Sequence, residues 1–303
     1  MLNVKFSEKQ IEQEIKRICE FISKELHGRD QIIVAVSGGL DSDVVARLAN
    51  LTPAVKKIKL FTVLQHDMDP SHLQNARDLA VDLGQELVEL PLDQEPFRIM
   101  KALSQSDGET IFHPEGLDAM RMKCSLRTCI ISAYQDHGYI VLGTSNRTEY
   151  ETGFFLPFGD GIAHIKPIQH LYKTQVRQIA HALGTRETVI NQPASAGFWT
   201  GEEDLEDMAW WLFNEKPIVG ELISTEEEDK YVQNIRKQLT TEKVDQVLSG
   251  LSQGLDIEVI SSETCLSKDI IIKFTKLISA SGEFKRRAYN KSLELPSIGL
   301  LDS

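Results

Sequence analysis

The chain has 303 residues, of which 41% are hydrophobic and 26% are charged, as in an ordinary soluble globular protein with a large core. Its formal net charge of -12 argues against a general binder of nucleic acids or anionic membranes, because neither attracts a net anion. The sequence has no apolar block of signal-peptide type and no stretch near the roughly 20 apolar residues of a membrane span. Its four cysteines show no CxxC spacing, so we expect neither a zinc site nor a disulfide framework, and a reduced, cytoplasmic protein.

Helices and strands are predicted to alternate over the first two thirds of the chain. Ser7 followed by Gln10 is a capping-box pattern, and apolar residues at helical spacing then predict a helix over 8–26. Short β-branched runs predict buried strands over 31–36, 58–64, 86–92 and 139–144. Further helices are predicted over 42–51, 71–84, 118–138 and 173–184. This order predicts an α/β fold with a doubly wound parallel sheet, which binds ligands at the carboxyl ends of its strands.

The character of the sequence changes near Thr200. The following stretch is acidic and helix-prone with no clear strand, so residues of about 200–303 are predicted to add helices outside the sheet. We interpret 1–303 as a single domain with this helical part included. The acidic run 226–229 is predicted to be the solvated start of a helix.

A glycine-rich turn follows the first predicted strand, in the stretch "VAVSGGLDS" over 34–42. Glycines allow the backbone N–H groups to converge on an anion, and serine hydroxyls add donors. The carboxylate of Asp41 would repel phosphate unless a divalent cation lay between them. The turn lacks the lysine of GxxxxGK[ST] and the third glycine of GxGxxG. On this pattern alone, a phosphate cradle and a plain turn capped by Asp41 are equally supported.

Family resemblance favours the phosphate cradle. The motif "SGGLDS" resembles the SGGxDS signature of the PP-loop ATP pyrophosphatases, a fold class called adenine nucleotide alpha hydrolase-like. The segment 141–184 resembles NAD synthetase more specifically, with "GTSN", a glutamate, "GFFLPFGDG", a proline and "LYKTQV". The segments "QPASAGFWTGEEDLED", "MRMKCSLRTCIISAY" and "FKRR" resemble further motifs of that family, so the resemblance covers most of the chain.

The resemblance implies an ammonia-dependent ligase with Mg²⁺ as cofactor and ATP as co-substrate. ATP adenylates the nicotinate carboxylate of deamido-NAD, and ammonia then displaces AMP to give NAD. We expect free ammonia to be the nitrogen source, because only about 30 residues precede the first strand, whereas glutamine-using members carry a large amidase domain. A separate glutaminase stays open as a partner. The family also implies a homodimer.

The resemblance assigns roles to individual residues. The metal ligands are Asp41 and Glu149, whose carboxylates lie on one rim and would complete an octahedral Mg²⁺ site with phosphate oxygens. Asp41 and Lys173 are the catalytic residues, with Lys173 neutralising the departing pyrophosphate. The ATP-binding residues are Ser37, Gly38, Gly39, Asp41, Ser42, Thr144, Lys173 and Ser195. The substrate-binding residues are Lys123, Arg127, His164 and Lys285.

Several positions depart from the family pattern. Asp43 places an extra acid where we expect the phosphates, Ser125 replaces an arginine, and His164 replaces an aspartate near the nicotinate. The segment 202–215 also differs, at Glu202, Glu203 and Leu205 among others. These departures leave two alternatives: an enzyme with the same ATP chemistry and a different acid substrate, or a nucleotide-sensing protein without turnover.

Two groups of aromatic residues admit more than one interpretation. At least two of Phe154, Phe155 and Phe158 are expected in the core, while one could stack on a nicotinate or adenine ring. Trp210 and Trp211 are expected to serve packing or a dimer contact.

Overall fold

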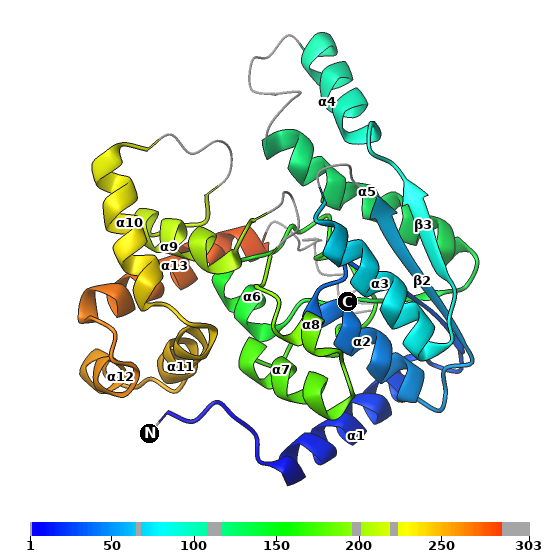
Figure 1. The fold of residues 1–303 in the computed structure, drawn as a ribbon, viewed down its shortest axis with the longest axis horizontal. Coiled ribbons are helices and arrows are strands. Elements are labelled where there is room, and N and C mark those ends of the chain that lie inside the picture. The colour runs from blue at the N-terminus through cyan, green and yellow to red at the C-terminus, as the bar shows by residue number, and fades with distance from the viewer. Residues whose placement is uncertain (1, 65–67, 108–116, 196–200, 219–223, 287–303) are drawn as a thin grey trace, which may run out of the picture.

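The computed structural model describes residues 2–64, 68–107, 117–195, 201–218 and 224–286. A parallel sheet in the order β3-β2-β1-β4 has helices packed against both of its faces (Figure 1). Its strands are β1 (Gln31–Ala35), β2 (Lys57–Leu64), β3 (Leu87–Pro91) and β4 (Ile140–Leu142). In the central strand, Ile33 pairs with Lys59 of β2 and with Val141 of β4. The predicted α/β fold with a parallel sheet is confirmed.

In chain order, the described helices are α1 (Glu8–Glu25), α2 (Leu40–Leu51), α3 (Pro70–Leu83), α4 (Glu95–Ser106), α5 (Leu117–Asp136), α6 (Arg147–Thr152), α7 (Lys173–Ala182), α8 (Glu187–Ile190), α9 (Asp204–Asn214), α10 (Glu226–Gln238), α11 (Thr241–Ser252), α12 (Ile257–Thr264) and α13 (Lys268–Arg286). The predicted helices among the first 190 residues are present within a few residues of their expected bounds. Helices α4, α6 and α8 were not predicted, and α6 and α8 are too short to give a periodic pattern.

Helices cover both faces of the central strands, which explains why β1 and β4 read as apolar runs, whereas β2 and β3 carry Lys59 and Glu89. Successive side chains of a strand point to opposite faces. Ile32 and Val34 join the core formed with α1, α2, α3 and α7. Ile33 faces the other side, where Phe61 and Ile131 of α5 pack. The sheet is therefore doubly wound, as predicted.

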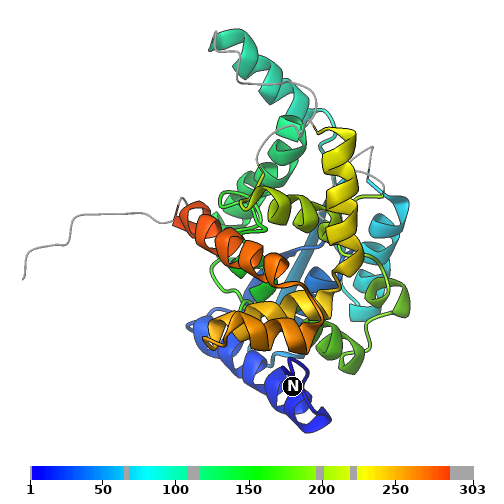
Figure 2. The same ribbon diagram turned by 90° about the vertical axis from the view of Figure 1, so that its left-hand side faces the viewer.

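Helices α9 to α13 surround a core of their own, beside the sheet and in contact with α6 and α7 (Figure 2). The first residues of the chain join this core, because Leu2 and Val4 are buried in it. The Leu2 N–H donates to the Glu263 carboxylate at 2.9 Å, and the Gln246 side chain donates to the Leu2 carbonyl at 3.0 Å. The predicted helical part is confirmed, with no strand in its described residues.

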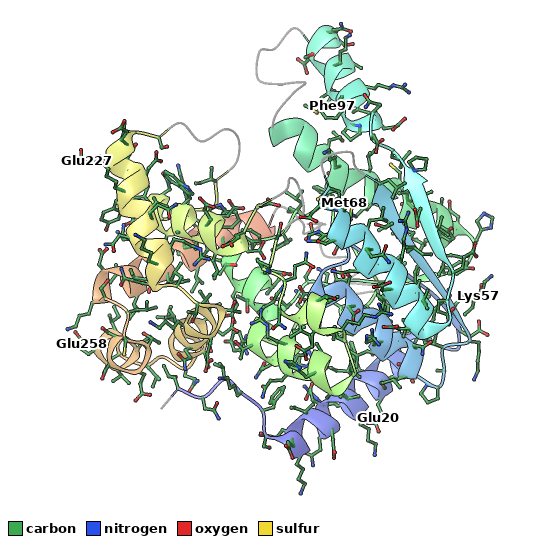
Figure 3. All side chains as sticks on the ribbon, viewed as in Figure 1. Glu20, Lys57, Met68, Phe97, Glu227 and Glu258 are labelled. Atoms are coloured by element: carbon green, nitrogen blue, oxygen red, sulfur yellow. The ribbon has the colours of Figure 1, made fainter. Side chains whose placement is uncertain are left out.

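The outer surface of the helical part carries acidic side chains. Glu227 on α10 and Glu258 on α12 project away from the body in Figure 3. Thr225 caps α10 in a capping box with Glu228, and Glu227 is exposed, so the predicted solvated helix start is confirmed. Over the ranges that the structure describes, no helix combines the length and the apolar character needed to cross a membrane.

Candidate active site

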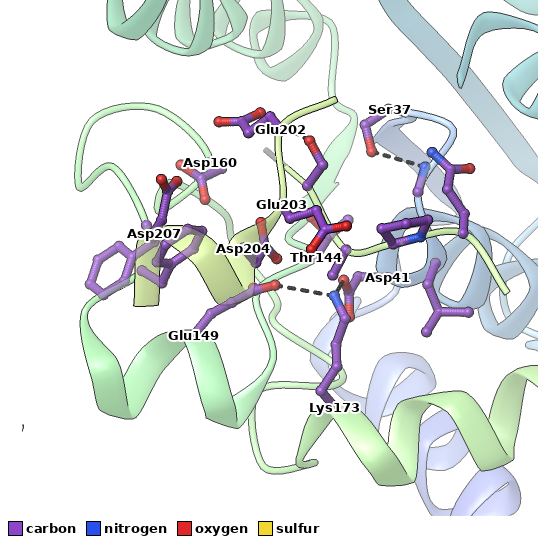
Figure 4. A pocket seen from close by; sticks show the side chains of 18 of the residues that line it. Ser37, Asp41, Thr144, Glu149, Asp160, Lys173, Glu202, Glu203, Asp204 and Asp207 are labelled. Carbon is purple, nitrogen blue, oxygen red and sulfur yellow. Dashed lines mark hydrogen bonds and ion pairs between the residues drawn. The ribbon is translucent and has the colours of Figure 1, made fainter. Parts of the chain in front are cut away.

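A cavity of about 660 Å³ opens where β1 and β4 end, between the glycine turn, α6, the start of α7 and the segment leading into α9 (Figure 4). Many of the predicted site residues line it: Ser37, Gly39, Asp41, Ser42, Arg127, Thr144, Glu149, Lys173 and Ser195. They come from segments as much as 158 residues apart in sequence, since Ser37 and Ser195 both belong to the lining. The position agrees with the rule that parallel sheets bind ligands at the carboxyl ends of their strands.

The glycine turn has a fixed shape. Gly38 has a φ of +80°, and a Cβ there would lie 1.9 Å from the carbonyl oxygen of His72, so no other residue fits. Gly38 packs against α3 and does not line the cavity, whereas Gly39 lines it as the N-cap of α2. The Gly39 N–H donates to the Ser37 hydroxyl at 3.2 Å, and the Ser42 hydroxyl donates to the Gly39 carbonyl at 3.0 Å. These bonds pre-organise a helix N-terminus that suits an anion.

Asp41, Glu149 and Lys173 meet on the floor of the cavity. Asp41 lies in the first turn of α2, Glu149 in α6, and Lys173 at the start of α7. The Lys173 ammonium is paired with the Asp41 carboxylate and lies 3.5 Å from Oε1 of Glu149. One buried cation therefore bridges the two carboxylates that the sequence analysis named as metal ligands.

Asn146 is a further member of this group that the sequence analysis did not name. It is fully buried, and its side-chain amide donates to Oδ1 of Asp41 at 3.0 Å. Asn146 also caps α6, where its side chain accepts from the Glu149 N–H at 3.0 Å and its own N–H donates to Glu149 at 3.2 Å. The signal was readable, because asparagine followed three residues later by glutamate has the spacing of a capping box.

Burial controls the charge states of these residues. Burial and the nearby Asp41 carboxylate raise the pKa of Glu149 well above its usual range, and Lys173 opposes this effect. Burial acts against the charge of Lys173, but the carboxylates of Asp41 and Glu149 outweigh it and raise the lysine pKa. Lys173 is therefore a cation throughout the physiological pH range.

The segment into α9 adds more acids to the cavity. Burial, with the carboxylates of Glu202 and Asp41, raises the pKa of Asp204 to about 6 against the opposing effect of Lys173. Burial and the charges of Glu202 and Asp204 raise the pKa of Asp207 to about 7. Figure 4 shows these acids around the cavity. The described carboxylates of the lining are Asp41, Glu149, Asp160, Glu202, Glu203, Asp204, Glu206 and Asp207; its lysine, arginine and histidine side chains are His72, Arg127, Lys173 and Arg177.

This excess of carboxylates fits a divalent cation. A polyphosphate would be repelled from such a surface unless a cation accompanied it. Asp41 and Glu149 offer the hard oxygen ligands that Mg²⁺ prefers, and they already converge on one cation. Within the described residues no group of three or more His, Cys, Asp or Glu side chains has metal-binding geometry. The two carboxylates would thus need oxygens of phosphate or water to complete an octahedral site.

The expectation that Asp43 lies beside the phosphates is wrong. Its side chain is buried behind the glycine turn and does not line the cavity. The carboxylate accepts hydrogen bonds from Nε of Arg47 at 2.6 Å and from the Thr185 hydroxyl at 2.5 Å. Arg47 also pairs with Asp82 of α3 at 2.9 Å. Asp43 thus joins α2 to α3 and to the residues after α7, and Asp41 is the acid of α2 that lines the cavity.

The predicted substrate-binding residues lie in different surroundings. Arg127 lines the cavity, while Lys123 is buried with its ammonium 5.8 Å from the centre of the Phe97 ring. His164 is exposed and lies outside the cavity lining, and its Nδ1 accepts a hydrogen bond from the Val141 N–H at 2.9 Å. Lys285 belongs to the last turn of α13, and its side chain lies outside the described residues.

Aromatic side chains form one wall of the cavity. Phe154 and Phe155 line it, whereas Phe158 is 65% exposed and lies outside it. Trp210 and Trp211 also line it, and the ring centres of Trp211 and Phe154 are 4.8 Å apart. The tryptophans therefore reach the cavity as well as packing against the helical core, a role that the sequence analysis did not assign to them.

Comparison with known proteins gives this cavity a family context. The family model described as NAD synthase matches residues 14–229. An NH(3)-dependent NAD(+) synthetase of Thermoplasma acidophilum is 32% identical over 199 residues, which are 65% of this chain and 78% of the relative. One of Pyrococcus furiosus is 27% identical over 241 residues, 75% of this chain and 90% of the relative.

Solved structures share the fold. An NMN synthetase from Francisella tularensis has a TM-score of 0.69 at 21% identity, covering 97% of this chain and 99% of its own. An NH3-dependent NAD synthetase from Campylobacter jejuni has a TM-score of 0.64 at 19% identity, covering 94% and 99%. The family match spans the glycine turn, Glu149, Lys173 and the acidic segment into α9. The chain therefore belongs to the NAD synthase family.

Proposed function

We propose that the chain catalyses the ATP-dependent amidation of the nicotinate carboxylate of deamido-NAD by ammonia. The carboxylate oxygen attacks the α-phosphorus of ATP and pyrophosphate leaves, which gives an acyl-adenylate. Ammonia then attacks the acyl carbon, AMP departs, and the new amide nitrogen loses a proton. The observation that carries this proposal is the meeting of Asp41, Glu149 and Lys173 beside the glycine turn in a chain of the NAD synthase family.

The residues of the cavity have separate tasks in this reaction. The N–H groups at the start of α2, beside Ser37 and Gly39, hold the phosphates. Lys173 places a fixed positive charge where negative charge develops on the departing pyrophosphate. Arg127 binds the acid substrate from α5. No side chain acts as a covalent nucleophile, so the rate depends on orientation and charge neutralisation.

Asp41 and Glu149 would hold Mg²⁺, which neutralises phosphate charge when it is bound. The donor set is all oxygen, which suits this metal. Bound there, the metal would supply the positive charge that these two carboxylates require, and it would leave the Lys173 ammonium available to the phosphates.

The test is product formation from deamido-NAD and Mg-ATP with either ammonium or glutamine, measured as AMP and NAD by chromatography. We expect equal amounts of AMP and NAD with ammonium, and none with glutamine. As the matched control, Asp41→Asn is expected to abolish AMP formation and keep the wild-type circular dichroism spectrum. A wild-type chain that forms AMP with another acid and none with deamido-NAD would overturn the proposed substrate.

A second candidate substrate is nicotinate mononucleotide, the acid that corresponds to NMN. Its support is the likeness to the Francisella protein named NMN synthetase, which extends over 97% of this chain. The altered segment 202–215 also lines the cavity, so the departures from the family pattern lie where the acid would bind. Competition between the two acids at equal concentration decides between them through the ratio of NMN to NAD produced.

We also propose a homodimer in the cytoplasm, which the family resemblance implies. Sedimentation equilibrium would show a mass of twice 34.1 kDa. A separate glutaminase as ammonia source would appear as glutamine-supported NAD formation in a cell extract, lost when the chain is purified.

A further inference from the structure

One buried carboxylate of the helical part makes hydrogen bonds to both sides of the active site. Asp245 of α11 has no solvent exposure. Its Oδ1 accepts from the Thr148 hydroxyl at 2.6 Å, and its Oδ2 accepts from the Thr174 hydroxyl at 2.6 Å and the Thr174 N–H at 2.7 Å. Thr148 and Thr174 directly adjoin Glu149 and Lys173 in sequence.

Asp245 thereby accepts a hydrogen bond from a backbone N–H at the start of α7, the helix whose first residue is Lys173. The first N–H groups of a helix have no partner within the helix, and an acid there also interacts favourably with the helix dipole. The Thr174 N–H is bonded to Asp245, and the Lys173 N–H donates to the Thr148 hydroxyl at 3.0 Å. The Thr148 hydroxyl therefore accepts a hydrogen bond from the Lys173 N–H and donates one to the Asp245 carboxylate.

We propose that Asp245 is a positioning residue that fixes Lys173 and Glu149 relative to each other. It touches neither of them through the bonds described, and it acts through Thr148 and Thr174. Its burial makes the arrangement rigid, because a buried carboxylate must keep all its hydrogen-bond donors. The helical part thus contributes to the reaction by holding one carboxylate behind the cavity.

The proposal rests on the proposed function for its turnover assay, and ATP binding provides a second measurement that needs no acid substrate. Asp245→Asn keeps the size of the side chain and replaces one of its two acceptor oxygens by an NH2 donor, so the three donors of Thr148 and Thr174 are left with a single acceptor oxygen. We expect it to raise the Kd of Mg-ATP by calorimetry and to lower kcat, each by about 10-fold, since misplacement of a catalytic group by about 1 Å can cost about 100-fold. The Kd and kcat are both measured at a temperature well below the thermal unfolding midpoint of the variant.

Leu248→Ala is the matched control. Leu248 lies in the same helix and is 1% exposed in the helical core, but it has no part in these hydrogen bonds. We expect Leu248→Ala to lower the unfolding midpoint and to leave the Kd of Mg-ATP and kcat unchanged. Equal losses of ATP affinity in both variants would show that Asp245 acts only through stability, and would overturn the proposal.

The milder variant Thr174→Val tests the connection itself. Combined with Asp245→Asn, it should lower kcat by a smaller factor than it does alone, because both changes weaken the same connection between Thr174 and Asp245. Fully multiplicative losses would contradict the proposal. A wild-type chain that binds ATP but forms no amide would instead sink the proposed function alone, since the ATP affinities of the variants still report on Lys173.

Discussion

At the scale of single residues, the structure shows how the protein holds two partly buried carboxylates together with its own cation. Lys173→Met removes this cation and leaves Asp41 and Glu149 facing each other. We expect a loss of about 3 kcal/mol in the free energy of unfolding at pH 8, because a buried charge without its partner is costly. Mg²⁺ should restore more stability to the variant than to the wild type, which thermal unfolding with and without Mg²⁺ would measure. An equal Mg²⁺ effect in both proteins would show that these carboxylates do not bind the metal.

For Asp43, which lies only two residues from Asp41, we predict an effect on stability without an effect on ATP binding. Its carboxylate is bonded to Arg47 and Thr185 behind the turn, so Asp43→Asn should destabilise the protein by about 3 kcal/mol. The KM for ATP should stay at the wild-type value, because the side chain does not face the cavity. Urea unfolding and steady-state kinetics measure the two effects. A large change in KM at unchanged stability would place Asp43 at the phosphates after all.

At the scale of an element, α9 begins with acids that repel each other. Burial and nearby carboxylates raise the pKa of Asp207 to about 7. A carboxyl group whose pKa is raised by folding binds more protons in the native state, so its contribution to stability falls as pH rises from about 4 to about 7. Asp207→Asn should therefore gain about 1 kcal/mol over the wild type at pH 8 after discounting for solvent screening, and much less at pH 4. Denaturant unfolding at both pH values, without metal, measures this difference, and a pH-independent difference would contradict it.

The elements also show what the sequence can predict. Short runs of apolar residues predict the strands, most clearly β1 and β4, which are buried on both faces. The motifs predict Asp41, Glu149 and Lys173 because the family pattern fixes their spacing. Asp43 could not be placed from the sequence, since its direction depends on Arg47 and on Thr185, which is 142 residues away. No sequence pattern indicated the role of Asp245. A single acid in an amphipathic helix is normally interpreted as a surface charge, and its hydrogen bonds from Thr148 and Thr174 are visible only in the structure.

At the scale of the whole molecule, the sheet and the helical part are interpreted as a single domain. They have separate cores, but α11 and α13 pack on α6 and α7, and the bonds of Asp245 are buried between them. We therefore predict one cooperative unfolding transition. The chain's three tryptophans lie at 199, 210 and 211, so their fluorescence reports on the segment around α9 while far-UV circular dichroism reports on all helices. The two urea curves should coincide, and distinct midpoints would show two domains.

The burial of Leu2 and Val4 among α9 to α13 links the segment before α1 to helices that are made much later. During synthesis, the first residues leave the ribosome long before α11 and α13 exist. They can take their final place only when those helices have emerged as well. The segment before α1 is thus among the first parts to be synthesised and among the last to be buried.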